Sequence, residues 1–253
     1  MNAFSYRVQT LQPSAIREIL KFTADPEVIS FAAGNPAPEA FPTEEIARIT
    51  NEILTTTPID ALQYSITEGY TPLRNWIKDD LKKKGMFNEN DEDVVITSGA
   101  QQAIEVVTKE ICNEGDTIIC EAPTFIGSLN AFRSYNAKLV GVEMEDDGIN
   151  IDKLEKALIE NPRTAFIYLI PNFQNPTGKT MSLEKRKAVL ALAQKYNVYI
   201  LEDNPYGDLR YIGENVPTIK SLDKNGNVLY AGTFSKTLAP GPVSYTHLTL
   251  PTI

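Results

Sequence analysis

Short apolar runs alternate with amphipathic stretches along most of the chain after about residue 90. This alternation is typical of βα units, because a strand buried between two layers is apolar throughout, whereas its covering helix is apolar on one face. The pattern therefore predicts a mostly parallel sheet covered by helices. The predicted strands span residues 94–97, 117–120, 138–142, 165–170, 198–202 and 228–233, and the predicted helices between them span residues 100–112, 125–134, 151–159 and 183–196.

Boundary residues support two of the predicted helices. Ser182 stands at an N-cap position and Asn197 follows the last helical residue of the same segment. Thr71, Pro72 and Gly85 bracket an earlier helix as its N-cap, its first helical position and its stop signal.

The first part of the chain has a different pattern. Residues 15–22 and 44–54 are helical by periodicity, and the irregular stretch FAAGNPAPEAFP lies between them. That stretch is polar enough, and has the glycine needed, to line a binding site.

Composition narrows the class of protein. The chain has 253 residues, of which 42% are hydrophobic and 23% charged, and these are ordinary values for a globular protein. The formal net charge of −9 argues against a nucleic-acid partner. No apolar run is long enough to span a membrane, and the N-terminus lacks the pattern of a secretory signal. The two cysteines have no metal-ligand spacing, so we expect no metal and a reducing, cytoplasmic location.

Lys236 is the first residue that could carry chemistry. It follows the strand at 228–233, which puts it at the carboxyl edge of the predicted sheet, where open α/β folds bind their ligands. A lysine there can be a solvated loop cation, or it can be an imine-forming lysine that reacts after losing its proton. Lys236 alone does not decide between the two interpretations.

The stretch Ser98-Gly99-Ala100-Gln101-Gln102 follows the first strand and begins a helix. Free backbone N–H groups at a helix N-terminus form an anion site, and Gly99 permits close approach of a phosphate. An ordinary strand-to-helix turn would have the same pattern, so both interpretations stand.

Two more polar residues follow strands at the same predicted edge. Asp203 ends the strand in VYILED, and a carboxylate there could keep a heteroaromatic ring nitrogen protonated, although a turn aspartate is the plainer interpretation. Asn175 lies in PNFQNPTG after the strand AFIYLI, where its amide could donate to a phenolate oxygen, although NPTG is also a common turn. The conjunction of these residues with Lys236 at one edge is far more specific than any of them alone.

In this combination the chain resembles the class I/II aminotransferases, which are pyridoxal 5'-phosphate (PLP) enzymes of fold type I. The resemblance runs from about residue 14 to residue 241, and the stretches PSAIREILK, ISFAAGNPAPEAFP, LQYSITEGYTPLR and LEDNPYGDLRY look most like the 2-aminoadipate, aromatic and branched-chain subgroup. It implies an α/β fold in three layers, α/β/α, built on a mostly parallel sheet.

The resemblance implies catalytic roles for Lys236, Asp203 and Tyr206, and a binding role for Asn175. Lys236, in TFSK, matches the Schiff-base lysine, which also moves the proton during transamination. Asp203 matches the partner of the pyridinium nitrogen, and Asn175 and Tyr206 match the donors to the phenolate oxygen. Asn175 is also expected to contact the substrate.

It also implies the remaining contacts to the cofactor. Gly99, Ala100 and Gln101 match the phosphate cradle, to which Thr233 and Ser235 would add hydroxyl groups.

Three further residues match contacts that reach the cofactor or the substrate from other directions. Phe125, in EAPTF, matches an aromatic residue that stacks on the pyridine ring. Tyr64 matches a tyrosine that reaches the phosphate of a neighbouring subunit, which implies a homodimer with shared sites. Gly34 lies in a segment that relatives fold over the substrate.

The resemblance ends abruptly after Gly241. Relatives have an arginine that binds the cofactor phosphate shortly after this glycine, then one more strand and a small C-terminal domain, whereas here Pro242 and Val243 follow. We therefore expect an N-terminal arm at residues 1–45, an incomplete PLP-binding major domain at 46–241 and a non-native tail at 242–253. Residues 243–250 are β-prone enough to fill the gap between the first strand and the strand that leads to Lys236. His247, in this tail, is given no catalytic role.

The implied function is transfer of an amino group between an amino acid and a 2-oxo acid, with the chain as an N-terminal fragment of the enzyme. Two alternatives remain open. A PLP-dependent lyase or decarboxylase could use the same fold, and a regulator-like protein could keep the PLP-binding domain without catalysis. The sequence does not name the amino donor or acceptor.

Overall fold

The computed structural model describes residues 27–29, 36–241 and 245–249. The predicted helix at residues 15–22 lies outside the described residues.

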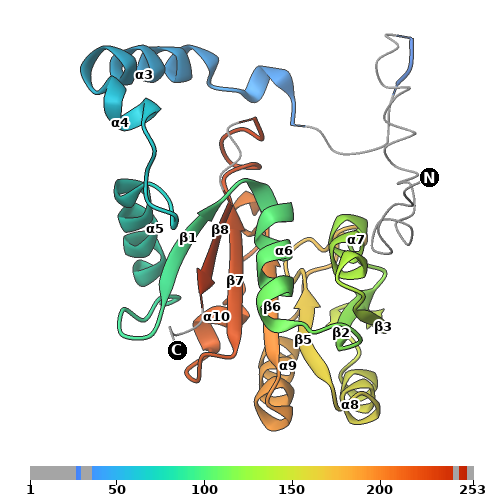
Figure 1. Cartoon of the computed structure of the whole chain (residues 1–253). Coiled ribbons are helices and arrows are strands. Elements are labelled where there is room, and N and C mark those ends of the chain that lie inside the picture. The colour runs from blue at the N-terminus through green and yellow to red at the C-terminus, as the bar shows by residue number, and fades with distance from the viewer. Residues whose placement is uncertain (1–26, 30–35, 242–244, 250–253) are drawn as a thin grey trace, which may run out of the picture.

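An eight-stranded sheet forms the centre of the fold (Figure 1). Its spatial order is β1-β8-β7-β6-β5-β2-β3-β4. The strands are β1 (Asp93–Thr97), β2 (Thr117–Ala122), β3 (Lys138–Glu145), β4 (Gly148–Ile149), β5 (Thr164–Leu169), β6 (Tyr199–Asn204), β7 (Val228–Thr233) and β8 (Tyr245–Thr249). All six predicted strands are present, with ends that differ from the prediction by at most a few residues.

Five strands in the middle of the sheet, β3, β2, β5, β6 and β7, run parallel to one another. β8 is antiparallel to both of its neighbours, β7 and β1, so β1 points in the same direction as β7. The prediction that residues 243–250 could fill the gap between the first strand and the lysine strand is confirmed for Tyr245–Thr249. Thr246 pairs with Gly232 on one side and with Ile96 on the other.

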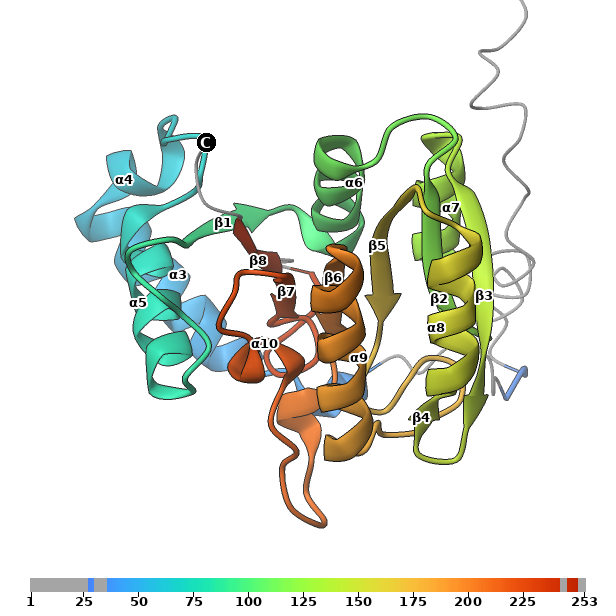
Figure 2. The same ribbon diagram turned by 90° about the horizontal axis from the view of Figure 1, so that it is seen from below.

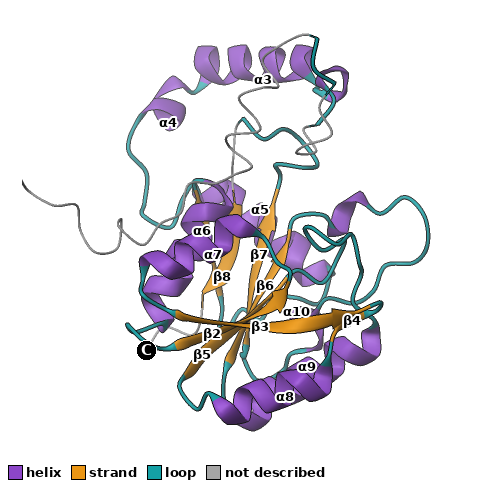
Figure 3. Ribbon diagram, turned by 90° about the vertical axis from the view of Figure 1, so that its right-hand side faces the viewer, coloured by secondary structure: helices purple, strands orange, loops and turns teal. Residues whose placement is uncertain are grey.

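Helices cover both faces of the sheet (Figures 2 and 3), which confirms the predicted three-layer α/β/α architecture. One apolar core joins one face of the sheet to α6 and α7, and a second core joins the other face to α8, α9 and α10. These helices are α6 (Gly99–Ile111), α7 (Ile126–Ser134), α8 (Ile151–Glu160), α9 (Leu183–Tyr196) and α10 (Ile219–Leu222).

The N-terminal part of the described chain contacts the sheet through one helix. α5 packs against β1 and β7 through Ile77 and Leu81. α3 and α4 stand away from the sheet (Figure 1) and bury no residue of their own. The elements of this part are the 3-10 turn η2 (Pro38–Ala40), α3 (Thr43–Thr56), α4 (Pro58–Leu62) and α5 (Thr71–Lys83).

The predicted helix boundaries have different outcomes. The Ser182 side chain accepts a hydrogen bond from the Lys185 N–H, and Asn197 ends α9 in the left-handed conformation at φ 52°, so both predictions are confirmed. The prediction that Thr71 is the N-cap of α5 was wrong. The Arg74 N–H donates to the carbonyl of Tyr70, so Tyr70 is the capping residue and Thr71 is already helical.

We expect β8 to be needed for stability because it supplies backbone partners to two strands at once. Thr246→Pro removes one N–H from the middle of the sheet and should lower the free energy of unfolding by about 1–3 kcal/mol. Urea unfolding followed by circular dichroism measures this change. Thr246→Val keeps the N–H and should unfold close to the parent chain; equal unfolding midpoints for the two variants would contradict a structural role for β8.

Candidate functional site

The sequence-predicted residues gather at one edge of the sheet. Because β1 points in the same direction as the parallel strands, the carboxyl ends of β1, β2, β5, β6 and β7 meet at this edge. Gly99, Phe125, Asn175, Asp203 and Lys236 each follow, or end, one of these five strands. The fold thus brings together residues that lie far apart in the sequence.

Asp203 is held in place by a chain of buried hydroxyl groups. Its side chain is near the end of β6, and the residue is 3% exposed. The Tyr168 hydroxyl donates to Asp203 Oδ2 at 2.7 Å, and the Ser128 hydroxyl donates to the Tyr168 oxygen at 2.8 Å. Sequence reasoning missed Tyr168 and Ser128, because the tyrosine lies inside the apolar run AFIYLI and looks like an ordinary core residue.

Asn175 and Tyr206 lie side by side, which is the arrangement expected of two donors to one phenolate oxygen. Asn175 Nδ2 is 3.4 Å from the Tyr206 hydroxyl oxygen. Burial raises the pKa of Tyr206, an effect that the nearby Asp203 reinforces and the bond from Asn175 opposes. At neutral pH the Tyr206 hydroxyl therefore keeps its proton and can donate it in a hydrogen bond.

A tight turn follows β7 and carries Lys236. Thr233 Oγ1 accepts from the Ser235 N–H at 3.0 Å and lies 2.9 Å from the Ser235 hydroxyl oxygen. The Leu238 N–H donates to the carbonyl of Phe234 and closes the turn around Lys236. Lys236 is half-buried, and its ammonium group has no hydrogen-bond or ion-pair partner among the residues that the structure describes. The turn thus presents two hydroxyl groups and one unpaired amine.

The N-terminus of α6 is open to a ligand. Gly99 has a φ of 81°, a left-handed conformation that glycine adopts without strain, and it is buried. The preceding Ser98 makes no side-chain cap, and the Gln102 side chain accepts from the Ser98 N–H rather than from the N–H groups of Gly99, Ala100 and Gln101. These groups have the geometry of an anion site.

Phe125 precedes α7 and is half-buried. A Cβ atom at Gly127 would lie 2.6 Å from its ring atom Cε1, so only glycine leaves room for the ring in this position. Sequence reasoning missed Gly127, which has no feature of its own in the sequence.

Two predicted residues remain to be accounted for. Gly34 lies outside the described residues. Tyr64, between α4 and α5, is 98% exposed and donates its backbone N–H to the adjacent Gln63 side chain.

A buried carboxyl group at the end of β2 was also missed. Glu121 is 2% exposed, and its Oε2 accepts from the Ile170 N–H at 3.1 Å and from Gln174 Nε2 at 3.3 Å. Its other oxygen, Oε1, is buried without a hydrogen-bond partner. Burial, with a smaller contribution from the charge of Asp203, raises the pKa of Glu121 to about 8. The group is therefore mostly a neutral acid at pH 7.

Arg186, on α9, anchors the loops on the other side of this edge. It is fully buried, and burial lowers its pKa, while the field of Glu202 opposes that change. Its guanidinium group donates to the carbonyl oxygens of Pro171, Met181, Val216 and Pro217 and to Asn172 Oδ1. The loop after β5 and the loop after β6 are thus tied to one side chain.

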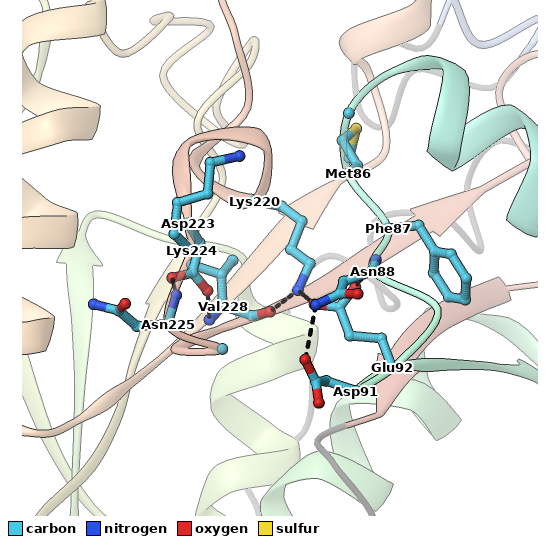
Figure 4. A pocket seen from close by; sticks show the side chains of 12 residues that line it. Met86, Phe87, Asn88, Asp91, Glu92, Lys220, Asp223, Lys224, Asn225 and Val228 are labelled. Atoms are coloured by element: carbon cyan, nitrogen blue, oxygen red, sulfur yellow. Dashed lines mark hydrogen bonds and ion pairs between the residues drawn. The ribbon is translucent and has the colours of Figure 1, made fainter.

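A polar cavity lies at the opposite edge of the sheet (Figure 4). It has a volume of about 420 Å³ and is lined by the segment before β1 and the turn between α10 and β7. Lys220 crosses it, pairs with Glu92 and donates to the carbonyl of Val228 at 3.0 Å. Its one buried cation is thus already neutralised, and none of the predicted residues lines it, so we attach no chemistry to it. A second, apolar cavity of about 370 Å³ lies beside Tyr206 and is lined by Phe173, Leu209, Tyr211 and Ile212 as well.

Within the described ranges, no group of histidine, cysteine, aspartate or glutamate side chains is arranged to hold a metal ion. Of the helices described, none combines the length and the apolar character needed to cross a bilayer.

Comparison with known proteins agrees with this arrangement. The family model described as aminotransferase class I and II matches residues 26–240. The chain belongs to this family. It is 44% identical to aromatic-amino-acid aminotransferase 1 of Thermococcus litoralis over 94% of its own length and 58% of that protein. The chain thus spans about three fifths of the length of the curated relatives that it matches.

Solved aminotransferase structures have the same fold. The kynurenine aminotransferase of Pyrococcus horikoshii, in complex with PMP, superposes with a TM-score of 0.90 at 39% identity, covering 96% of this chain and 61% of that one. The α-aminoadipate aminotransferase of Thermus thermophilus, in complex with N-(5'-phosphopyridoxyl)-L-leucine, superposes with a TM-score of 0.86 at 35% identity, covering 98% and 61%. These likenesses confirm the predicted fold type I and the predicted subgroup.

The residues present fit a pyridoxal phosphate group. The uncapped N-terminus of α6 suits a phosphate, the buried Asp203 suits a protonated ring nitrogen, and the unpaired amine of Lys236 suits an aldehyde. The phosphate, the ring nitrogen and the aldehyde of such a group would each find a chemically matching partner at this edge.

Glu121 makes the stability of the fold depend on pH. Its pKa of about 8 lies above the ordinary value of 4.5, so between these limits the folded chain holds a proton that the unfolded chain has released. Its contribution to stability is complete below about pH 4.5 and is lost as the pH rises to about 8, at up to about 1.4 kcal/mol per pH unit. Glu121→Gln does not titrate, so its free energy of unfolding should fall less steeply over this range. Urea unfolding at several pH values compares the two slopes; equal slopes would contradict the raised pKa.

Proposed function

We propose that this chain forms the cofactor-binding part of a PLP-dependent aminotransferase, which transfers an amino group between an amino acid and a 2-oxo acid. The observation that carries the proposal is the position of Lys236 and Asp203 at the carboxyl ends of adjacent parallel strands, β7 and β6. An unpaired amine and a buried, hydrogen-bonded carboxylate at one sheet edge are what this chemistry requires from the protein.

The ring of bound PLP withdraws electrons from the substrate Cα, and the protein supplies the proton transfers and the orientation. Lys236 would supply the amine for the cofactor aldehyde, and the same amine would serve as the base that accepts the proton from the substrate Cα. Asp203 would stabilise a proton on the ring nitrogen, while Tyr168 fixes the direction of its carboxylate. Asn175 and Tyr206 would donate to the phenolate oxygen, and Asn175 would also contact the substrate.

The phosphate group would be held at the N-terminus of α6. The N–H groups of Gly99, Ala100 and Gln101 would bind its oxygens, and the Thr233 and Ser235 hydroxyls would add two donors. The arginine expected shortly after Gly241 does not follow it in this sequence, so the donors of this chain to the phosphate would be neutral groups.

The names of the relatives indicate a chemical class for the amino donor. The aromatic, kynurenine and 2-aminoadipate aminotransferases similar to this chain favour an amino donor with an aromatic or a long acidic side chain. The alternatives, a lyase or decarboxylase and a non-catalytic domain of a regulator, are less favoured, because these relatives are named aminotransferases.

A homodimer is part of the proposal. Tyr64 would reach the phosphate bound by a second subunit, which agrees with its 98% exposure on the chain alone. Apolar side chains of α3 and α4, among them Ile53 and Leu62, are exposed beside it and would gain cover in a dimer. The cytoplasmic location, the absence of nucleic-acid and membrane partners, and the domain limits at residues 45 and 241 stay predictions.

The first test is cofactor binding by the chain as it stands. With added PLP, we expect an absorbance band between about 320 and 450 nm that requires Lys236. Borohydride should then fix the cofactor on that residue, and the mass of the protein should rise by that of one reduced cofactor. Lys236→Ala should lose both the band and the adduct. Lys224→Ala, which changes an exposed lysine at the opposite edge, should keep them; an adduct that forms equally on Lys236→Ala would contradict the assignment.

The second test concerns the ring nitrogen. Asp203→Asn keeps an acceptor for Tyr168 but loses the negative charge, so PLP should still bind, while conversion of a bound aromatic amino acid slows by roughly 10²-fold, as when one preorganised electrostatic partner is removed. Stopped-flow absorbance after mixing with the amino acid measures that rate. Asp116→Asn, a buried carboxylate at the other end of the sheet, serves as the control. A rate for Asp203→Asn close to that of the control would contradict this role.

A further inference from the structure

Two loops at the carboxyl edge must keep a fixed spacing if their residues are to contact one ligand. The loop after β2 leads to Phe125, and the loop after β5 carries Asn175. Their strands are neighbours in the sheet, but the loops extend beyond the last backbone pair, Cys120 with Tyr168. Some other contact must set the distance between them.

The Gln174 side chain makes that contact. It is 1% exposed, and its Nε2 donates to the carbonyl of Pro123 at 2.8 Å and to Glu121 Oε2 at 3.3 Å. Its Oε1 accepts from the Thr177 N–H at 3.0 Å and from the Thr177 hydroxyl at 2.7 Å. One amide group therefore joins the loop after β2 to the turn that contains Asn175.

Backbone bonds make that turn rigid around the same residue. The Gln174 N–H donates to the carbonyl of Lys179 at 2.8 Å, and the Gly178 N–H donates to the carbonyl of Gln174 at 2.6 Å. Asn175 lies inside this closed turn, so its position follows that of Gln174.

Glu121 completes the connection. A single oxygen of its carboxyl group, Oε2, accepts from both the Ile170 N–H and Gln174 Nε2, and this ties the end of β5 to the amide. The groups whose charge couples to it are Asp203 on β6 and the thiol of Cys120 beside it on β2.

We propose that Glu121 and Gln174 are positioning residues, which clamp the Phe125 loop and the Asn175 turn into one unit and so set the width of the cofactor site. The effect of the clamp on cofactor binding rests on the proposed function. The clamp itself is a property of the chain without ligand.

The clamp suits a protonated carboxyl group. A neutral acid accepts both bonds through one oxygen and leaves its hydroxyl at the unpartnered Oε1, whereas an ionised carboxylate would add a buried charge beside Asp203. Since the pKa of Glu121 is about 8 in the clamp and 4.5 in an exposed carboxyl group, the clamp should be tightest below about pH 4.5 and should loosen as the pH rises to about 8.

Amide hydrogen exchange on the ligand-free chain tests the clamp, read by mass spectrometry on peptides that cover residues 121–127 and 174–179 and corrected for the intrinsic effect of pH. Glu121→Ala should raise exchange in both peptides together by about tenfold, the change expected when the bond between Glu121 and Gln174 is lost. The parent chain should show increasing exchange as the pH rises from about 4.5 to about 8. Glu121→Gln should stay protected at all pH values, because it mimics the neutral acid.

Two further measurements give the experiment its controls. Asp116→Asn changes a buried carboxylate at the far end of β2 and should leave exchange in both peptides unchanged. If Glu121→Ala fails to fold, the pH series of Glu121→Gln against the parent chain decides. Unchanged exchange in Glu121→Ala, or a rise between about pH 4.5 and 8 that persists in Glu121→Gln, would overturn the proposal.

The link to the cofactor is a separate measurement. The dissociation constant for PLP should rise about tenfold in Glu121→Ala and stay near the parent value in Glu121→Gln. If the parent chain binds no PLP, the proposed function fails for this chain while the exchange data still decide the clamp. If PLP binds equally to all variants, the clamp does not set the width of the site.

Discussion

The spacing between β1 and β7 governs the rest of the site. β1 delivers the open end of α6, β7 delivers Lys236, and the two strands never pair with each other, because β8 lies between them. Adjacent strands lie about 4.8 Å apart, so the one intervening strand separates β1 from β7 by roughly 10 Å. The proposed ligand, which would contact both the N-terminus of α6 and Lys236, requires that this spacing is kept. The backbone bonds of β8 to the strand on each side maintain it.

Burial of charge is the second constraint, and the chain meets it in a different way for each group. Asp203 receives a hydrogen bond from Tyr168, and Lys220 is paired with Glu92. Arg186 is satisfied by carbonyl oxygens, and Glu121 is neutral at pH 7. Among these described charged groups, Lys236 is the one left without a partner, and it is the group to which we assign the reaction with the cofactor.

Much of this could be predicted from the sequence, because the information is local. Apolar runs determine the six parallel strands, and Ser182 and Asn197 determine the ends of α9 through bonds to residues within one turn. The positions of Asp203, Asn175 and Lys236 follow from the strands that precede them. The short elements α4, β4 and α10 were not predicted, because they contain too few residues to show a repeating pattern of apolar positions.

What could not be predicted depends on contacts between distant segments. The hydrogen bond between Tyr168 and Asp203 joins residues 35 positions apart, and that between Gln174 and Glu121 joins residues 53 positions apart. No local sequence pattern therefore indicates either bond. Each of these side chains also has an ordinary local interpretation, as a core aromatic residue or a turn amide. Tertiary structure alone gives them a role near the site.

The anchoring of two loops by Arg186 has a consequence for how the protein can change. Residues 211–215 directly precede the tied part of the loop after β6 and are all exposed, and Tyr211 and Ile212 line the apolar cavity beside Tyr206. The bonds from Arg186 to the carbonyls of Val216 and Pro217 fix the chain where this exposed stretch ends. Insertions and substitutions in residues 211–215 can therefore remodel the wall of that cavity while the anchored segment after them keeps its position.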